Sequence, residues 1–219
     1  MSEEMNHLTD QNELLKRMRA IASDLWRETP DVTATPKPAP EKPVQVVVKR
    51  PEIGIDNLWM TADETIDWTD ALAHERPSDG LTSVRLWNFY HDHAEAVLSG
   101  STAAYAEVLR KANPLGELTG FAEGINMRAP DPDRVEGQFT CRRDLLESHG
   151  RKYLSAMGIR IARDLLACLP VGEVGVKAVL DGETVMDVTY RREEMIHRNF
   201  SYLDPVKLTE ECGAVFSGV

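Results

Sequence analysis

The chain has 219 residues, a formal net charge of −11 and an isoelectric point near 5.0. Hydrophobic residues make up 42% of it, which is enough for a substantial core. Phosphate backbones and anionic lipids repel an acidic chain, so this charge disfavours broad binding to nucleic acids and to membrane surfaces. No long apolar run interrupts the sequence, so we expect no membrane-spanning segment.

The cysteines indicate a reducing environment. Cys141, Cys168 and Cys212 lie far apart in the sequence and form no C-x-x-C motif. This spacing argues against a disulfide framework and against a thiolate zinc site. The opening residues MSEEMNHLTDQNELL are acidic and polar, unlike a signal peptide. We therefore expect a cytoplasmic protein, and no motif in the sequence calls for a cofactor.

The first 28 residues (1–28) have the pattern of a solitary amphipathic helix. Asp10 and Glu13 have the spacing of an N-terminal capping box, and Pro30 follows the pattern. Apolar residues recur at intervals of three and four. This apolar stripe consists of Leu14, Leu15, Met18, Ile21 and Leu25. A helix this short is marginal alone, so the stripe should bind the chain's own domain, a second copy in a short coiled coil, or another protein.

Residues 29–52 are expected to be a proline-rich linker. Prolines alternate there with small and charged residues in ETPDVTATPKPAPEKP, which favours an extended, semi-rigid chain. The following stretch VQVVVKRP is rich in β-branched residues and could form an edge strand or a docking segment. A helix tethered by such a linker is more often an assembly device than part of an active site.

Residues 53–219 are expected to form an α+β domain, with a helical part over 53–112 followed by two helix–hairpin units over 113–219. Thr61 and Glu64 suggest a capping box for the first helix. The helices expected before the first hairpin cover 62–74, 83–98 and 102–112. A further helix at 149–169 separates the two hairpins. Its apolar stripe, which includes Leu154, Met157 and Ile161, is wide and predicts a largely buried helix. Asp204, Pro205 and Gly213 frame a last helix at 205–212.

The hydrophobic period changes to two in the two hairpins. The first is expected over 121–141 with its turn at 129–133, and the second over 174–190. Together they predict a four-stranded antiparallel sheet with helices on one face.

The register of the second hairpin can be predicted from its side chains. A two-residue Asp-Gly turn would place Val176 opposite Asp187, which sets an apolar residue against a charge. A three-residue loop at 181–183 instead places Val176 opposite Val188 and Lys177 opposite Asp187. A slip of one residue moves every side chain to the other face, so the second register is favoured. It also pairs Ala178 with Met186 and Val174 with Tyr190.

The last third of the chain contains YLSAMGIRIARDLLACLP, then a hairpin, then NFSYLDP. This order of an Ala-Arg-Asp-Leu helix ending in Leu-Pro, strands, Asn-Phe and Asp-Pro resembles a C-terminal module of bacterial proteins whose activity is not known. The resemblance implies a bacterial source and no particular activity.

The stretch FYHDHAEAV raises the possibility of a metal site. On a helix, His91 and His93 lie about 200° apart, so the two cannot hold one ion together. One of them could still join His74 or His149 in space, which would give a metal-dependent hydrolase or nuclease. The simpler interpretation places His91 on the solvated face and His93 at the edge of the core.

Charged residues in the C-terminal half could likewise have either a functional or a structural role. Arg160, Arg163 and Asp164 could form an anion-binding or catalytic group, but an Arg160–Asp164 pair along the helix, with Arg163 reaching a carbonyl or carboxylate, is favoured. Four basic residues could instead support nucleic-acid binding, a weaker alternative that the acidic composition disfavours. They are Arg142, Arg143, Arg151 and Lys152.

No P-loop, dinucleotide-binding, nucleophile-elbow or zinc-protease motif is present. The sequence therefore favours a non-catalytic protein-interaction or accessory subunit, which uses its N-terminal helix for self-assembly or docking.

Overall fold

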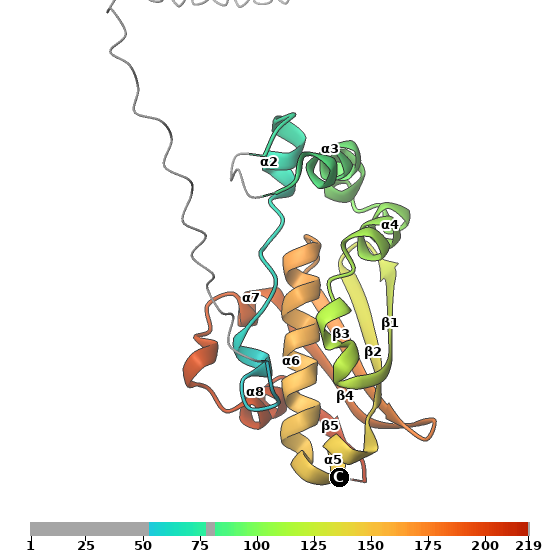
Figure 1. The fold of residues 1–219 in the computed structure, drawn as a ribbon, viewed down its shortest axis with the longest axis vertical. Helices are drawn as coiled ribbons and strands as arrows, with labels where there is room; N and C mark the ends of the chain where they lie inside the picture. The colour runs from blue at the N-terminus through green and yellow to red at the C-terminus, as the bar shows by residue number, and fades with distance from the viewer. Residues whose placement is uncertain (1–52, 78–81, 219) are drawn as a thin grey trace, which may run out of the picture. The chain divides into compact units, whose positions relative to one another are not determined.

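A computed structural model describes residues 53–77 and 82–218. The expected N-terminal helix (1–28) with its apolar stripe and the linker (29–52) lie outside these residues. The α+β class predicted from the sequence is confirmed, because the strands form one mixed sheet and helices pack against it (Figure 1).

The sheet has five strands in the order β1-β2-β3-β4-β5. Their bounds are Ala122–Asp131, Arg134–Cys141, Glu173–Leu180, Glu183–Arg191 and Val215–Phe216. The predicted four-stranded antiparallel sheet is wrong in two details. The two-residue strand β5 adds a fifth member, and β2 pairs with β3 in parallel. The other neighbouring pairs are antiparallel.

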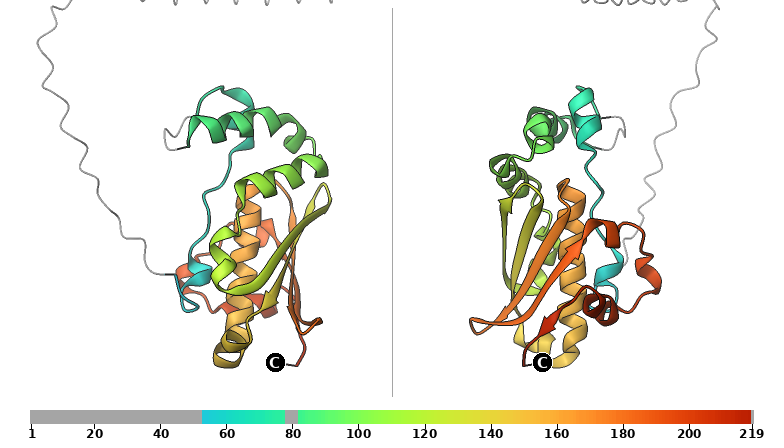
Figure 2. Two further views of the ribbon diagram at one scale, coloured as in Figure 1. Left: turned by 45° about the vertical axis from the view of Figure 1, so that its right-hand side comes forward. Right: turned by 180° about the vertical axis from the view of Figure 1, so that it is seen from behind.

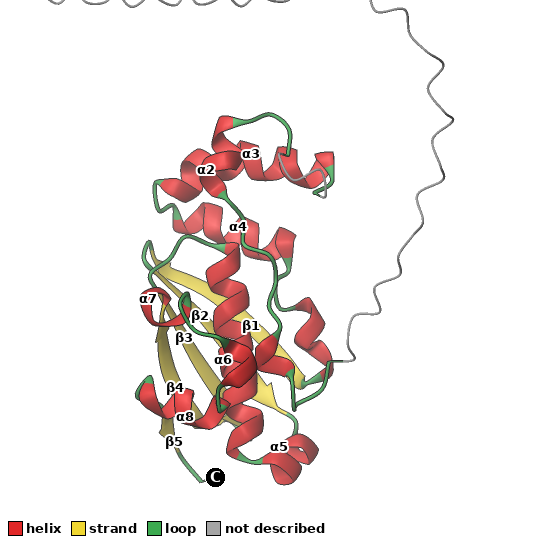
Figure 3. Ribbon diagram, turned by 90° about the vertical axis from the view of Figure 1, so that its left-hand side faces the viewer, coloured by secondary structure: helices red, strands yellow, loops and turns green. Residues whose placement is uncertain are grey.

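The parallel pair follows from the helix between the hairpins. After β2, the short helix α5 (Arg143–His149) leads through Gly150 into α6 (Arg151–Cys168). Gly150 has a φ of +53°, in the region that favours glycine, and this sharp corner separates the two helices. Helix α6 runs back along one face of the sheet, so β3 starts beside the start of β2 (Figure 3). The sequence did not predict α5.

The second hairpin has the predicted strand register and a different turn. Ala178 pairs with Met186 and Lys177 with Asp187, as expected. The turn has only two residues, Asp181 and Gly182, with φ values of +52° and +87°, which is the favoured geometry for a tight hairpin. A bulge at Val185 then shifts the register by one. The hairpin thus combines the tight Asp-Gly turn with apolar cross-strand pairs.

The first hairpin is tighter than predicted. Its strands continue to the pair Asp131–Arg134, so the turn consists of Pro132 and Asp133 rather than residues 129–133. The register is irregular between Arg128 and Asp131, where Pro130 lies at the free edge of the sheet.

Within the described residues, three α-helices precede the sheet: α2 (Trp68–Ala73), α3 (Val84–Leu98) and α4 (Thr102–Ala112). The last two match the predicted helices, and Ser83 and Ser101 cap them by accepting backbone hydrogen bonds.

The predicted helix over 62–74 is wrong in its first half, because it starts only at Trp68, after the N-cap Asp67. Residues 61–67, which we call the strap, are extended because their backbone groups bond to α6. The Asp63 amide donates to the Asp164 carboxylate at 2.8 Å, and the Ile66 amide donates to the Ala167 carbonyl at 2.9 Å.

One hydrophobic cluster joins the helical part and the sheet. Helix α6 is at its centre, with 15 of its 18 residues buried, and this confirms the prediction of a largely buried helix. Trp68 and Trp87 are core residues, and their indole N–H groups donate hydrogen bonds to backbone carbonyls. Trp68 donates to Cys168 at 3.0 Å, and Trp87 donates to His74 at 2.9 Å. Two short α-helices lie between β4 and β5: α7 (Arg192–Met195), and α8 (Pro205–Glu211) where a last helix was predicted.

The Asp-Gly turn provides a test of the hairpin geometry. Gly182→Ala should lower the free energy of unfolding by about 1 kcal/mol, because an alanine resists a positive φ. Asp181→Asn should have a smaller effect, since asparagine tolerates the left-handed region and only a surface ion pair to Arg143 is lost. Urea unfolding of both variants checks this, and equal losses would contradict the turn assignment.

Candidate interaction surface and buried charge cluster

The face of the sheet opposite α6 is open in the part of the chain that the structure describes (Figure 2). Because side chains alternate along a strand, every second residue of β1 to β4 points to this face. A chain of ion pairs crosses four strands there, from β1 to β4. Arg128 pairs with Glu136 at 2.5 Å, Arg134 lies 3.3 Å from both Glu136 and Glu173, and Arg191 lies 3.2 Å from Glu173. The open face is therefore highly charged, and these charges are engaged in ion pairs.

Glu136 is the centre of this chain of ion pairs. Burial on its own would raise the pKa of this carboxyl group, but hydrogen bonds and positive charge from Arg128 and Arg134 lower it overall. Glu136 is thus a stably ionised partner for two arginines.

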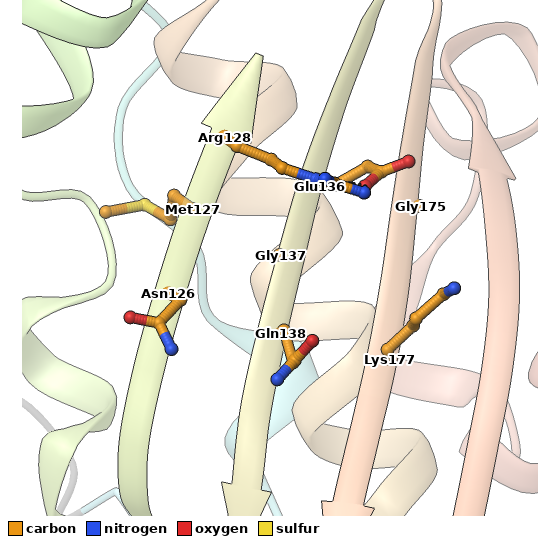
Figure 4. A pocket seen from close by; sticks show the side chains of 8 residues that line it. All are labelled: Asn126, Met127, Arg128, Glu136, Gly137, Gln138, Gly175 and Lys177. Atoms are coloured by element: carbon orange, nitrogen blue, oxygen red, sulfur yellow. Dashed lines mark hydrogen bonds and ion pairs between the residues drawn. The ribbon is translucent and has the colours of Figure 1, made fainter. Parts of the chain in front are cut away.

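A hollow of about 270 Å³ opens beside this chain of ion pairs (Figure 4). Gly175 lies at its margin, and a Cβ atom there would come within 2.5 Å of the Arg134 guanidinium. Lys177 also lines the hollow and is 3.4 Å from Asp187, the predicted cross-strand partner. Strands β1 and β2 add Asn126 and Gln138, whose exposed carboxamides hydrogen-bond to no residue among 53–77 and 82–218. The hollow therefore offers polar groups that are free to bind.

On the other side of the sheet, α6 carries a buried charge cluster. Arg160 and Asp164 are 1% and 0% exposed, and the guanidinium Nε lies 2.6 Å from the carboxylate. Arg160 also donates to the Thr61 hydroxyl and, at 3.2 Å, to Glu117. The predicted pair is confirmed, but it is buried beneath the strap rather than lying along a polar flank.

The Asp164 carboxyl group is affected by two opposing influences. Burial raises its pKa to about 7, although the charge and hydrogen bond of Arg160 favour the ionised form. Its second oxygen accepts the Asp63 amide of the strap. Both oxygens of the carboxylate are therefore engaged in holding the strap and the helix together, which is a structural role.

Arg163 was predicted to reach either a carbonyl or a carboxylate group, and it reaches carbonyl groups. Its Nη1 donates to the carbonyls of Trp59 at 2.6 Å and Thr61 at 3.2 Å, and its guanidinium lies 3.9 Å from the centre of the Phe200 ring. The residue thus attaches the segment before the strap to α6.

The two histidines of FYHDHAEAV both lie on α3 and have separate partners. The His93 Nδ1 atom lies 2.8 Å from the Phe89 carbonyl, and its Nε2 atom lies 2.8 Å from the Glu107 carboxylate on α4. His91 contacts the Ala71 carbonyl at 2.7 Å and is half-buried against α2. The expectation that His91 lies on the solvated face is therefore wrong, because the last turn of α2 covers it.

The other two candidate ligands, His74 and His149, do not complete a metal site. His74 pairs with Asp70 at 2.6 Å, and His149 lies in the last turn of α5. Among residues 53–77 and 82–218, no group of three or more His, Cys, Asp or Glu is arranged to hold a metal ion. The geometry gives the metal-dependent alternative no ligand set.

The basic residues considered for nucleic-acid binding each have a carboxylate partner. The pairs are Arg142–Asp144, Arg143–Asp181, Arg151–Glu210 and Lys152–Asp56. These partners neutralise much of the local positive charge, so the residues form no basic patch of the kind that binds phosphate backbones.

The cysteines have the character of inert thiols. Burial raises the pKa of Cys141 to about 11, of Cys168 to about 12 and of Cys212 to about 11. A nucleophilic cysteine needs the opposite shift, since the thiolate is the reactive form.

No protein-family model, curated protein or solved structure matches the chain. The resemblance of its last third to a bacterial module therefore stays a prediction. Among the described residues, no helix has the length and apolar character needed to cross a membrane.

The buried pair can be tested with two carboxylates that contact the same arginine. Asp164→Ala should lower the free energy of unfolding by about 3–5 kcal/mol, because Arg160 would lose its buried partner. Glu117→Ala should cost about 1 kcal/mol or less, since the Glu117 side chain is 48% exposed and water replaces it. Chemical denaturation measures both, and similar losses would show that Asp164 is not the main partner.

The contact between α3 and α4 predicts a pH effect. The hydrogen bond to Glu107 is the largest cause that raises the pKa of His93 above its usual value of 6.5. The folded state therefore gains stability from this pair at pH below about 6.5, and loses it as the pH rises through the raised pKa. In Glu107→Gln the pKa of His93, followed by NMR titration, should fall. An unchanged value would contradict the pairing.

Proposed function

We propose that this protein is a non-catalytic accessory subunit that binds another protein or a second copy of itself. The observation that carries the proposal is the open sheet face. Around a hollow it presents the exposed carboxamides of Asn126 and Gln138, which hydrogen-bond to no described residue, and the charged groups Glu136 and Lys177 beside them are engaged in ion pairs.

The remaining candidate residues also favour binding over chemistry. Arg160, Asp164 and His93 are engaged in contacts that join one element of the fold to another. Catalytic groups need a free site for a reacting atom between them, and these residues surround no such space.

The N-terminal stripe is the proposed docking element, on the evidence of its sequence. Leu14, Leu15, Met18, Ile21 and Leu25 repeat at helical spacing and precede a proline-rich linker. An apolar stripe held at a distance from its domain gains stability only when a partner covers it. The open face then gives a second, polar surface for the same or another partner.

The stripe can be tested in the full chain. The double variant Met18→Glu/Ile21→Glu should abolish self-association, measured by light scattering after size exclusion, or capture of a host protein, identified by mass spectrometry. The reason is that two carboxylates cannot be buried in an apolar contact without a large desolvation cost.

Ser23→Glu is the matched control, because at about 100° per residue Ser23 lies opposite the stripe of the expected helix. This variant should assemble normally. If the unmodified chain is monomeric and recovers no specific partner, or if the stripe variant behaves as the unmodified chain does, the stripe is not a docking element.

A further inference from the structure

A second cavity lies between the strap and the segment that follows α7. Its volume is about 350 Å³, and side chains from three parts of the chain line it. The strap contributes Asp63, α6 contributes Arg163 and Leu166, and the later segment contributes Arg198 and Phe200. Arg192, the first residue of α7, also lines this cavity.

Two of these arginines differ from the other shielded arginines of the fold. Arg134, Arg142 and Arg160 are buried or half-buried, and each pairs with a carboxylate. Arg163 and Arg192 are also half-buried, but among the described residues they bond only to carbonyl groups. Carbonyls satisfy N–H donors, and those at the end of α6 carry partial negative charge, but neither arginine has a carboxylate of a described residue in direct contact.

Burial has the expected effect on both groups. Desolvation lowers the pKa of Arg163 and of Arg192, although nearby aspartates oppose the change. Arginine keeps its proton at any pH of interest, so both groups stay positively charged in spite of the cost of burial.

The lining of the cavity is positively charged in a strongly acidic protein. It contains three guanidinium groups and one carboxylate, that of Asp63. Spare donors remain as well. Only Nη1 of Arg163 donates to a described residue, Arg192 uses Nε and Nη2, and Arg198 uses Nε and Nη1. Each guanidinium thus keeps at least one nitrogen available to a ligand.

We propose that this cavity, which we call the arginine cavity, binds an oxyanion, a carboxylate or a phosphate group. Arginine donates paired, charge-assisted hydrogen bonds to both groups, which fits this chemistry better than binding of a neutral ligand. The apolar side chains of Leu166 and Phe200 would contact the body of a ligand that carries the anion. This inference is independent of the proposed N-terminal docking, because it uses other residues and a small ligand.

The test is calorimetric titration of the full chain with two probes, inorganic phosphate and benzoate, at constant ionic strength. At least one should bind saturably, with a dissociation constant of about 1 mM or tighter. Preference for phosphate would indicate a phosphorylated ligand, and preference for benzoate would indicate a carboxylate attached to an apolar body.

Two variants that change the cavity in opposite directions make the result specific. Arg198→Gln should weaken binding about tenfold by removing a charged donor. This side chain is partly exposed and bonds to Glu211 and the Glu194 carbonyl, so the fold should tolerate the change. Asp63→Asn should strengthen binding severalfold, because it removes the one carboxylate of the lining.

Arg110→Gln in the last turn of α4 is the control, since Arg110 is exposed, lies outside both the arginine cavity and the open sheet face, and its replacement changes the net charge of the protein by the same amount as Arg198→Gln. It should leave the affinity unchanged. The proposal is overturned if neither probe saturates, if Arg110→Gln and Arg198→Gln have equal effects, or if neither cavity variant alters the affinity.

Discussion

The buried ion pair between Arg160 and Asp164 constrains the whole domain. Helix α6 is covered almost all round, so a charged pair on it must be shielded from water and must also have its remaining hydrogen bonds satisfied. The strap does both, because it is extended and presents the Asp63 amide and the Thr61 hydroxyl to the pair. A helix beginning at residue 62 would use the Ile66 amide for its own first turn, and the bond from this amide to the Ala167 carbonyl of α6 would be lost. The contacts with α6 thus explain why residues 61–67 are not helical.

This constraint also connects the two halves of the domain. Past the strap, Trp68 donates to the Cys168 carbonyl at the end of α6 and leads into α2. The position of α2 then determines which residues of α3 become buried, including His91, whose ring contacts the last turn of α2. The ion pair on α6 therefore also influences which residues of α3 are buried.

The predictions succeeded where a local pattern determined the structure. The spacing of Leu154, Met157 and Ile161 was sufficient to identify α6 as a buried helix, and alternation was sufficient to set the strand register around Val176. They failed where distant residues competed with a local signal. Thr61 and Glu64 have the spacing of a capping box, but Arg160, 99 positions from Thr61, takes the hydroxyl instead. The arginine cavity was missed for the same reason, since its lining comes from three separate segments.

The three proposed surfaces differ in the partner chemistry that they favour. The open face has its charges matched by ion pairs, so a partner gains little from charge and must use the free carboxamides and shape. Polar contacts of that kind favour a partner that binds weakly and dissociates readily. The proposed N-terminal stripe would instead gain stability from apolar burial against a partner, which favours a lasting assembly. In the arginine cavity, Arg163 and Arg192 have no carboxylate of a described residue in direct contact, and this is why an anion is proposed there rather than a neutral ligand of similar size. A stable assembly through the stripe, combined with an exchangeable face and a small anion site, is the arrangement expected of an accessory subunit whose contacts are regulated.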